Sequence, residues 1–157
     1  MAPICDEPLV WALRRVEGPL SVKLMVNAPP PFIPGAFVGA EHHYRARVYF
    51  EDTDLSGIVY HANYLRYMER ARSDMLRIAG IDQRAAMDGG DGSWAVTDLA
   101  IKYRRPAKLD DDLLVVSTVE AVRGASVIIA QRILRGTDTL TGETLTEGQV
   151  TAAFLSP

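Results

Sequence analysis

A single change of periodicity constrains the fold of this 157-residue chain more than any other feature. In residues 44–51, apolar and polar side chains alternate, which is the period of two expected of a half-buried strand. In residues 61–79, apolar side chains recur every three or four positions, as they do on one face of an α-helix. Such a helix is about 30 Å long. Because its apolar face is wide, we expect it to lie across a sheet.

The predicted helix has one apolar face and one charged face. The apolar positions are Tyr64, Leu65, Met68, Ala71, Met75, Leu76, Ile78 and Ala79, and the charged ones are Arg66, Glu69, Arg70, Asp74 and Arg77. Arg70 and Asp74 are four positions apart, a spacing that favours an ion pair along the exposed face. Gly80 is expected to end the helix, because glycine accepts the left-handed conformation common at that position.

Four further strand-like runs follow the helix. They occupy residues 94–103, 113–122, 125–134 and 145–155, after a polar loop at 83–92. The last three runs are separated by short turns at Arg123-Gly124 and at 136–142, and short turns imply antiparallel neighbours. The sequence therefore predicts an α+β fold in which an antiparallel five-stranded sheet is wrapped around one long central helix.

Residues 1–43 differ in character from the rest of the chain. The stretch 28–35 reads Ala-Pro-Pro-Pro-Phe-Ile-Pro-Gly, and proline rings exclude both helix interior and central strand. The preceding stretch, 10–26, has a mixed pattern, compatible with a short amphipathic helix or with no stable structure. We therefore expect an N-terminal extension over 1–43 that is poorly ordered or irregular, followed by one domain over 44–157.

Such a domain leaves surface uncovered. One helix covers only one face of the sheet, the sheet edges are open, and the run at 127–129 has no clean polar face. Pairing with a second copy would cover these surfaces. The sequence predicts an obligate homo-oligomer.

Composition excludes several classes of protein. A net charge of −3 and a pI near 5.6 argue against general nucleic-acid binding. The only cysteine, Cys5, cannot form an intrachain disulfide, and no apolar run reaches the roughly 18 residues of a membrane span. The first residues include Asp6 and Glu7 and lack the features of a secretion signal. We expect a cytoplasmic protein without a membrane span.

The segment between the first strand and the helix, Phe50-Glu-Asp-Thr-Asp-Leu-Ser-Gly-Ile-Val-Tyr-His61, concentrates polar groups. Asp52, Asp54, Ser56 and Gly57 fit the first positions of a calcium-binding EF-hand loop, but Asn63 stands where a closing glutamate is required. His61 and the His42-His43 pair could suggest a transition-metal site, but they lack regular ligand spacing. Neither metal interpretation is favoured.

Two interpretations of this segment remain. Asp and Ser are common in turns and at helix N-termini, where they accept hydrogen bonds from free backbone N–H groups. Alternatively, a carboxylate delivered to the start of a long helix can act in acyl-transfer hydrolysis. The helix N–H groups would then stabilise the oxyanion, while the carboxylate attacks the carbonyl or activates water.

A family resemblance favours the second interpretation. The run RVYFEDTDLSGIVYHANYLRYMERARSDMLR resembles the 4-hydroxybenzoyl-CoA thioesterase family of the hotdog superfamily, in particular its Tol–Pal-associated, YbgC-type branch. The motifs are D-x-D-x-x-G over 52–57, V-Y-H-x-x-Y over 59–64 and E-R-A-R over 69–72. KYRRPAKLDD and VRGASVIIAQRI resemble later strands, so the likeness covers roughly residues 44–155.

The resemblance implies an acyl-CoA thioesterase whose site lies at a subunit interface. It implies Asp54 as nucleophile or general base, the His61 amide as oxyanion donor, and a role for the His61 side chain in orienting the thioester or relaying a proton. It implies no metal or other cofactor, coenzyme A being part of the substrate. The expected oligomer is a dimer of hotdogs, with assembly into a homotetramer favoured and dimer against tetramer left open. Acyl carrier protein is a further partner that we consider.

Other residues near the motif are assigned by position. Substrate contacts are predicted for Gly57, Val59, Tyr60, Arg123 and Ser126. Contacts to the CoA phosphates are predicted either for Arg104, Arg105 and Lys108 or for the Arg123–Ser126 turn. Asp52 is expected to be a turn acceptor, Tyr60 and Tyr64 packing residues, and Asn63 a helix cap. Glu69 is expected to be structural and paired with Arg66.

Two alternatives to the thioesterase stay open at this point. One is a scaffold that binds acyl-CoA or acyl carrier protein with little hydrolysis, against which the intact Asp54, Gly57 and His61 argue. The other is hydration of an enoyl thioester, whose longer helix-linked Asp/His motif is absent.

Overall fold

The computed structural model describes residues 35–90 and 92–155. The strands are β1 (Gly35–Val38), β2 (Glu41–Arg47), β3 (Ser93–Tyr103), β4 (Asp112–Arg123), β5 (Ser126–Arg135) and β6 (Glu143–Leu155); the helices are a 3₁₀ turn, η1 (Phe50–Asp52), and α2 (His61–Ile78) and α3 (Gln83–Asp88). The six strands form one antiparallel sheet in the order β1-β2-β4-β5-β6-β3. The α+β class and the central helix are confirmed.

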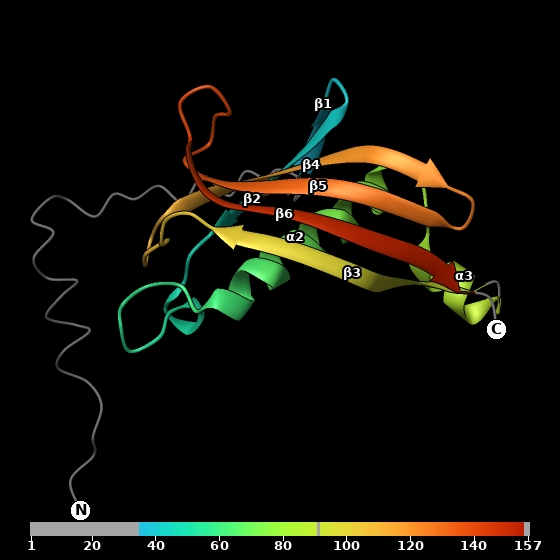
Figure 1. Ribbon diagram of the computed structural model, residues 1–157, viewed down its shortest axis with the longest axis horizontal. Helices are drawn as coiled ribbons and strands as arrows, with labels where there is room; N and C mark the ends of the chain where they lie inside the picture. Colours follow the sequence, from blue (N-terminus) through green and yellow to red (C-terminus); the bar gives the residue numbers. More distant parts are fainter. Residues whose placement is uncertain (1–34, 91, 156–157) are drawn as a thin grey trace, which may run out of the picture. The chain divides into compact units, whose positions relative to one another are not determined.

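The long helix α2 lies across one face of this sheet (Figure 1). It ends as predicted, with Gly80 in the left-handed region at φ 83°. The N–H of Gly80 donates to the carbonyl of Arg77 at 3.1 Å, and that of Ile81 to Leu76 at 2.9 Å. These two bonds satisfy two of the last carbonyls of the helix, the pattern of a Schellman motif.

The sheet begins earlier and has one more strand than predicted. Val38 pairs with Glu41 across a two-residue turn in which Gly39 has φ 61°, so β1 and β2 form a hairpin. β1, the turn and the first three residues of β2 lie within 1–43, the predicted extension, so residues 35–43 are part of the sheet. Residues 1–34 of that extension lie outside the described residues.

Two further elements differ from the prediction. β2 ends at Arg47, and the chain then turns through η1, which leaves Phe50 82% exposed although the alternation puts it on the buried face. A short helix, α3, forms within the predicted loop at 83–92; its N-cap Asp82 accepts bonds from the N–H groups of Arg84 and Ala85, both at 3.0 Å.

The core lies between α2 and the sheet. It consists of Val48, Val59, Tyr64, Tyr67, Met68, Ala71, Ala107, Leu113, Val115, Ile133 and Leu145. Gly148 allows a close approach here, since a Cβ on it would lie 3.3 Å from the terminal methyl of Met68. A second buried cluster, Leu114, Val116 and Leu134, is formed by the alternate residues of β4 and β5. The central strand β4 is therefore buried along most of its first half.

The prediction that Asp74 lies on the exposed face of the helix is wrong. Asp74 is 6% exposed, and its carboxylate bonds the Nε2 of the fully buried His42 at 3.0 Å and the guanidinium of Arg77 at 2.6 Å. Its ion-pair partner is thus Arg77 rather than Arg70. Gly35 packs so tightly on this pair that a Cβ there would lie 2.4 Å from the Asp74 carboxylate. The buried pair joins the β1–β2 hairpin to α2.

The described helices contain no segment that is both long enough and apolar enough to cross a membrane.

Candidate active site

The segment between η1 and α2 is folded so that its two ends meet. Asp52 is 7% exposed, and its carboxylate accepts a bond from the N–H of Tyr49 at 2.9 Å, the turn role predicted for it. The carbonyl oxygen of the same residue accepts bonds from the N–H of Tyr60 and from the side-chain amide of Asn63, each at 2.9 Å. Asp52 and Asn63 therefore fix the loop against the start of the helix.

Asp54 lies at the base of a tight turn within this loop. Its N–H donates to the carbonyl of Ile58 at 3.0 Å, and its carbonyl accepts from the N–H of Gly57 at 2.9 Å. Gly57 has φ 75°, a conformation that side chains rarely adopt, which explains glycine at this position. The turn leaves the Asp54 side chain exposed to solvent.

The Asp54 carboxylate is held by Ser56. Its Oδ1 accepts bonds from the Ser56 hydroxyl and from the Ser56 N–H, the latter at 2.8 Å. These bonds lower the pKa of Asp54, the hydroxyl bond contributing most, and the neighbouring His61 lowers it further. The carboxylate is therefore ionised at neutral pH and available as a base or nucleophile.

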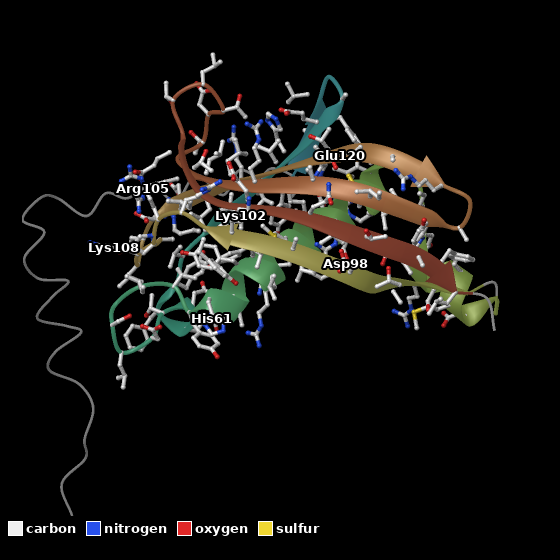
Figure 2. All side chains as sticks on the ribbon, in the orientation of Figure 1. His61, Asp98, Lys102, Arg105, Lys108 and Glu120 are labelled. Carbon is white, nitrogen blue, oxygen red and sulfur yellow. The ribbon has the colours of Figure 1, made fainter. Side chains whose placement is uncertain are left out.

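His61 is the first residue of α2 and lies exposed at that end of the domain (Figure 2). Tyr60 caps the helix without a side-chain hydrogen bond, and no group of the described residues accepts a bond from the His61 N–H. An unsatisfied N–H at the positive end of a helix dipole is suited to hold a negative oxygen. An exposed carboxylate and a helix-start N–H without a hydrogen-bond partner among the described residues thus lie at the same end of the domain.

Aromatic side chains surround the helix start. The hydroxyl of Tyr103, at the end of β3, donates to the carbonyl of His61 at 3.1 Å, and the rings of Tyr60 and His61 lie 4.3 Å apart between centroids. Desolvation raises the pKa of the Tyr103 hydroxyl, so it remains a donor. Tyr103 was not among the predicted site residues, because its contact to His61 joins positions 42 residues apart and no local pattern indicates it.

Val59 and Tyr64 form the buried base below the site. Val59 is 2% exposed, with its side chain in the core, so that side chain is not available to a ligand; its N–H donates to the carbonyl of Ala107 at 2.9 Å. The hydroxyl of Tyr64 accepts from the N–H of Ala107 at 2.8 Å, consistent with a packing residue. Tyr60, by contrast, is 46% exposed and accessible.

The basic residues after β3 lie at the same end of the domain as His61, where Arg105 and Lys108 are labelled in Figure 2. Arg104 pairs with Glu147 at 2.8 Å and Arg105 with Glu143 at 2.9 Å, so both already have a carboxylate partner, although Arg105 shares Glu143 with Arg135. Lys108 lies beside the Asp54 turn through a bridge to Ile58, and its ammonium forms no ion pair with a described residue. Of the three, Lys108 is the most available cation.

Arg123 and Ser126 lie at the other end of the sheet. They form the β4–β5 turn, in which the Ser126 hydroxyl donates to the carbonyl of Arg123 at 3.0 Å. Along β5, Ser126 is seven residues from Ile133, which lies in register with Thr146 and, through it, with Tyr103. Seven residues of strand span about 23 Å. Within one chain, the turn therefore does not reach the Asp54 site.

Among the described residues, no group of three or more His, Cys, Asp or Glu side chains is arranged to hold a metal ion. Glu69 is paired with Arg72 rather than with Arg66, the partner expected from the sequence.

Comparisons with known proteins agree with this fold. A sequence profile of the thioesterase superfamily matches residues 56–141, more than half of the chain. The chain is 40% identical over 111 residues to an acyl-CoA thioesterase, YbgC, of Haemophilus influenzae, covering 71% of this chain and 82% of that protein. A related YbgC acyl-CoA thioesterase of Helicobacter pylori is 36% identical over 89 residues, covering 57% of this chain and 64% of that protein.

Solved structures give the same result. A probable thioesterase of Bartonella henselae superposes with a TM-score of 0.64 at 34% identity, covering 75% of this chain and 92% of the other. A 4-hydroxybenzoyl-CoA thioesterase in complex with 4-hydroxybenzoyl-CoA superposes with a TM-score of 0.66 at 18% identity, covering 74% and 84%, and supports the fold alone. The profile match and the identity to YbgC proteins lead to one conclusion: the chain belongs to the thioesterase superfamily, with the hotdog fold, and its relatives include the YbgC acyl-CoA thioesterases.

Proposed function

We propose that this protein hydrolyses acyl-CoA thioesters to a free carboxylic acid and CoA, with Asp54 and the start of α2 as the catalytic site. One observation carries the proposal: an exposed carboxylate, kept ionised by Ser56, neighbours the open N-terminus of the central helix. Family membership and the identity to YbgC acyl-CoA thioesterases support the substrate class.

The reaction needs only groups of this chain and water. The thioester carbonyl oxygen accepts a hydrogen bond from the His61 N–H, which stabilises the negative charge that develops on it. The Asp54 carboxylate either attacks the carbonyl carbon, giving an anhydride that water then hydrolyses, or removes a proton from the attacking water. The carbon–sulfur bond breaks, and the CoA thiolate takes up a proton. The exposed His61 imidazole is positioned to orient the thioester or relay that proton.

The proposed working form is a homo-oligomer built on a dimer. β3 is an 11-residue edge strand, exposed over most of its length, and its free N–H and C=O groups favour antiparallel pairing with a second β3. Two-fold pairing about Asp98 would set Tyr103 opposite Ser93 of the second copy. In the second copy, the Arg123–Ser126 turn begins β5, which lies two strands inward from β3. The turn is therefore about 10 Å from Ser93 of that copy. Arg123 and Ser126 would then meet the CoA moiety from across the dimer, on the same side as Lys108.

Further elements of the proposal rest on the same chemistry. An acyl group carried on acyl carrier protein presents the same thioester and is included as a substrate. Cys5 is the only cysteine, which is compatible with a reducing cytoplasm, and we place the activity there.

The test is a thiol-release assay on acyl-CoA and acyl-carrier-protein thioesters of varied acyl length and aromatic character. Asp54→Asn should lower turnover roughly 10²- to 10⁴-fold, because the amide can neither attack nor accept a proton. Asp88→Asn, at an exposed carboxylate of α3, is the matched control and should keep wild-type turnover.

Near-normal turnover by Asp54→Asn would overturn the assignment of Asp54. Absence of thiol release from every thioester by the folded oligomer would overturn the enzymatic function and favour an acyl-binding scaffold.

A further inference from the structure

Two hollows lie in succession along the side of α2 that faces β3. The proximal hollow, about 300 Å³, is lined by the apolar side chains of Leu65, Leu99, Val150 and Val96 and by the charged residues Arg66, Glu69 and Arg72. The distal hollow, also about 300 Å³, is lined mainly by apolar side chains, among them Met75, Leu76, Trp94, Val119, Val127 and Ile129. Glu69, Arg72 and Val96 line both, so these three residues form the boundary between the hollows.

The proximal hollow begins one helical turn from the catalytic site. Leu65 follows His61 by four residues and therefore lies on the same side of α2. Leu99 precedes Tyr103 by four residues on the same face of β3, and the Tyr103 hydroxyl bonds the His61 carbonyl at 3.1 Å. An acyl group bound with its carbonyl at His61 is thus directed into the proximal hollow.

The boundary is polar and rigidly held. The Arg72 guanidinium bonds the Glu69 carboxylate and the side-chain oxygen of Gln131, the latter at 2.6 Å. Gln131 is 1% exposed and donates in turn to the carbonyl of Met68 at 3.0 Å and to the hydroxyl of Ser117 at 2.9 Å. A second bond, from the Ser73 hydroxyl at 3.2 Å, restrains Glu69. The Arg72 side chain is 12% exposed, so it has little freedom to move aside.

A methylene chain crossing this boundary would cover the Glu69 side chain, which is 58% exposed. The chain would remove water from a carboxylate while offering it no hydrogen bond, and such desolvation is unfavourable. The apolar distal hollow would favour a chain that had already crossed. The pair therefore acts as a barrier between the proximal hollow and the apolar distal hollow.

We infer that the Glu69–Arg72 ion pair sets the maximum acyl length of the substrate by closing the distal hollow to the acyl chain. The inference rests on the proposed function, since it takes the carbonyl to bind at His61. Glu69 lies eight residues, about 12 Å along the helix axis, from His61. Acyl chains longer than about this span are poor substrates of the wild-type protein.

The experiment replaces the pair by apolar residues of similar size, as Glu69→Leu/Arg72→Met, in the full-length oligomer. We expect kcat/KM for acyl-CoAs beyond the limit to rise tenfold or more, with little change for short chains. A third substitution, Val127→Phe, fills the distal hollow and should abolish the gain. An unchanged length profile in the double variant, or an equal gain at every length, would overturn the inference.

A binding measurement keeps the inference separate from the activity. Trp94 lines the distal hollow and is 37% exposed; with Trp11→Phe in every variant it becomes the only tryptophan. The probe is a non-hydrolysable thioether analogue of a long-chain acyl-CoA, a 2-oxoalkyl-CoA with bromine on the last carbon of the chain. It should quench Trp94 fluorescence in the protein with the double substitution and not in the protein that keeps Glu69 and Arg72. Quenching by the same compound in both proteins would overturn the barrier even if no thioester were hydrolysed. Glu69→Gln, which removes the charge and keeps the shape, gives the same comparison if the double variant does not fold.

Discussion

Ser56 donates two hydrogen bonds to one oxygen of the Asp54 carboxylate, from its N–H at 2.8 Å and from its hydroxyl. The other oxygen, Oδ2, receives no hydrogen bond from the part of the chain that the structure describes. One oxygen is therefore used to fix the carboxylate and the other remains free to react. Ser56, two residues from Asp54, controls both the orientation and the acidity of the proposed catalytic group.

Ser56→Ala should move the acidic limb of the pH–activity profile to higher pH. The hydroxyl bond is the largest cause of the lowered pKa of Asp54, so its loss raises that pKa and protonates the carboxylate at a higher pH. The measurement is kcat/KM for one acyl-CoA across the acidic range. Thr141→Ala, which removes an exposed hydroxyl from the β5–β6 loop, should leave the profile in place.

Tyr64→Phe should lower the free energy of unfolding by about 1–3 kcal/mol, because it leaves the buried N–H of Ala107 without an acceptor. Tyr103→Phe also removes one hydroxyl, but that group is half-exposed and water can replace it at the His61 carbonyl. We expect a cost of about 0.5 kcal/mol for the second variant. Urea denaturation of both variants gives the comparison, and equal losses would contradict it.

His42 should make the fold less stable as the pH falls through the range of histidine titration. Burial lowers its pKa in the folded state, outweighing the bond to Asp74, and the neighbouring His43 lowers it further. In the unfolded chain, the His42 imidazole therefore takes up a proton at about pH 6.5, whereas in the folded chain it takes up the proton only at lower pH. Stability is complete above that pH and is lost as the pH falls towards the lower folded-state pKa.

The surroundings of His42 are consistent with this sign. Asp74 and Arg77 of α2 and the ring of Phe37 of β1 face this cluster, and the Nδ1 atom of His42 has no hydrogen-bond partner among the described residues. Protonation would add a buried donor without an acceptor. His42→Gln should flatten the dependence of urea midpoint on pH, whereas His43→Gln should retain the part due to His42. A wild-type midpoint independent of pH between 5.5 and 7.5 would refute it.

Gly35→Ala should destabilise the domain by about 1–3 kcal/mol, since the added methyl group would lie 2.4 Å from the Asp74 carboxylate and 2.6 Å from the His42 imidazole. Ala36→Gly, at an exposed neighbour on the same strand, is the control and should cost about 1 kcal/mol or less. The two thermal midpoints measure the difference; a larger effect at Ala36 would argue against tight packing at Gly35.

The sequence predicted the elements whose patterns are local. The three-to-four-residue period and Gly80 gave α2 within one residue of its end, and the short turns gave the antiparallel order of the later strands. The β1–β2 hairpin was missed because β1 has only four residues directly after a proline-rich stretch. Asp74 was misplaced because its partner, His42, lies 32 residues away and cannot be read from helical spacing.

The candidate site likewise combines residues that local sequence patterns indicate with residues that only the packing of distant elements brings together. Asp54, Gly57 and His61 could be proposed from the sequence because turn chemistry, a helix start and a family motif coincide within eight residues. Tyr103 and the Glu69–Arg72–Gln131 network depend on how β3 and β5 pack on the helix, and no run of sequence carries that information. Arg123 and Ser126 were grouped with the site without knowledge of the sheet register. That register places them far from the site within one chain.

Asp54 and the first residue of α2, His61, are only seven positions apart, and short-range bonds hold the segment between them. The groups proposed to react thus lie in one contiguous peptide, whereas the walls of the hollows proposed to receive the acyl group are formed by α2 together with strands distant in the sequence. Substitutions in those walls can alter substrate choice over many generations without disturbing the bond-breaking step. Because of this separation, the substrate range of such a small domain can change while its reaction is kept.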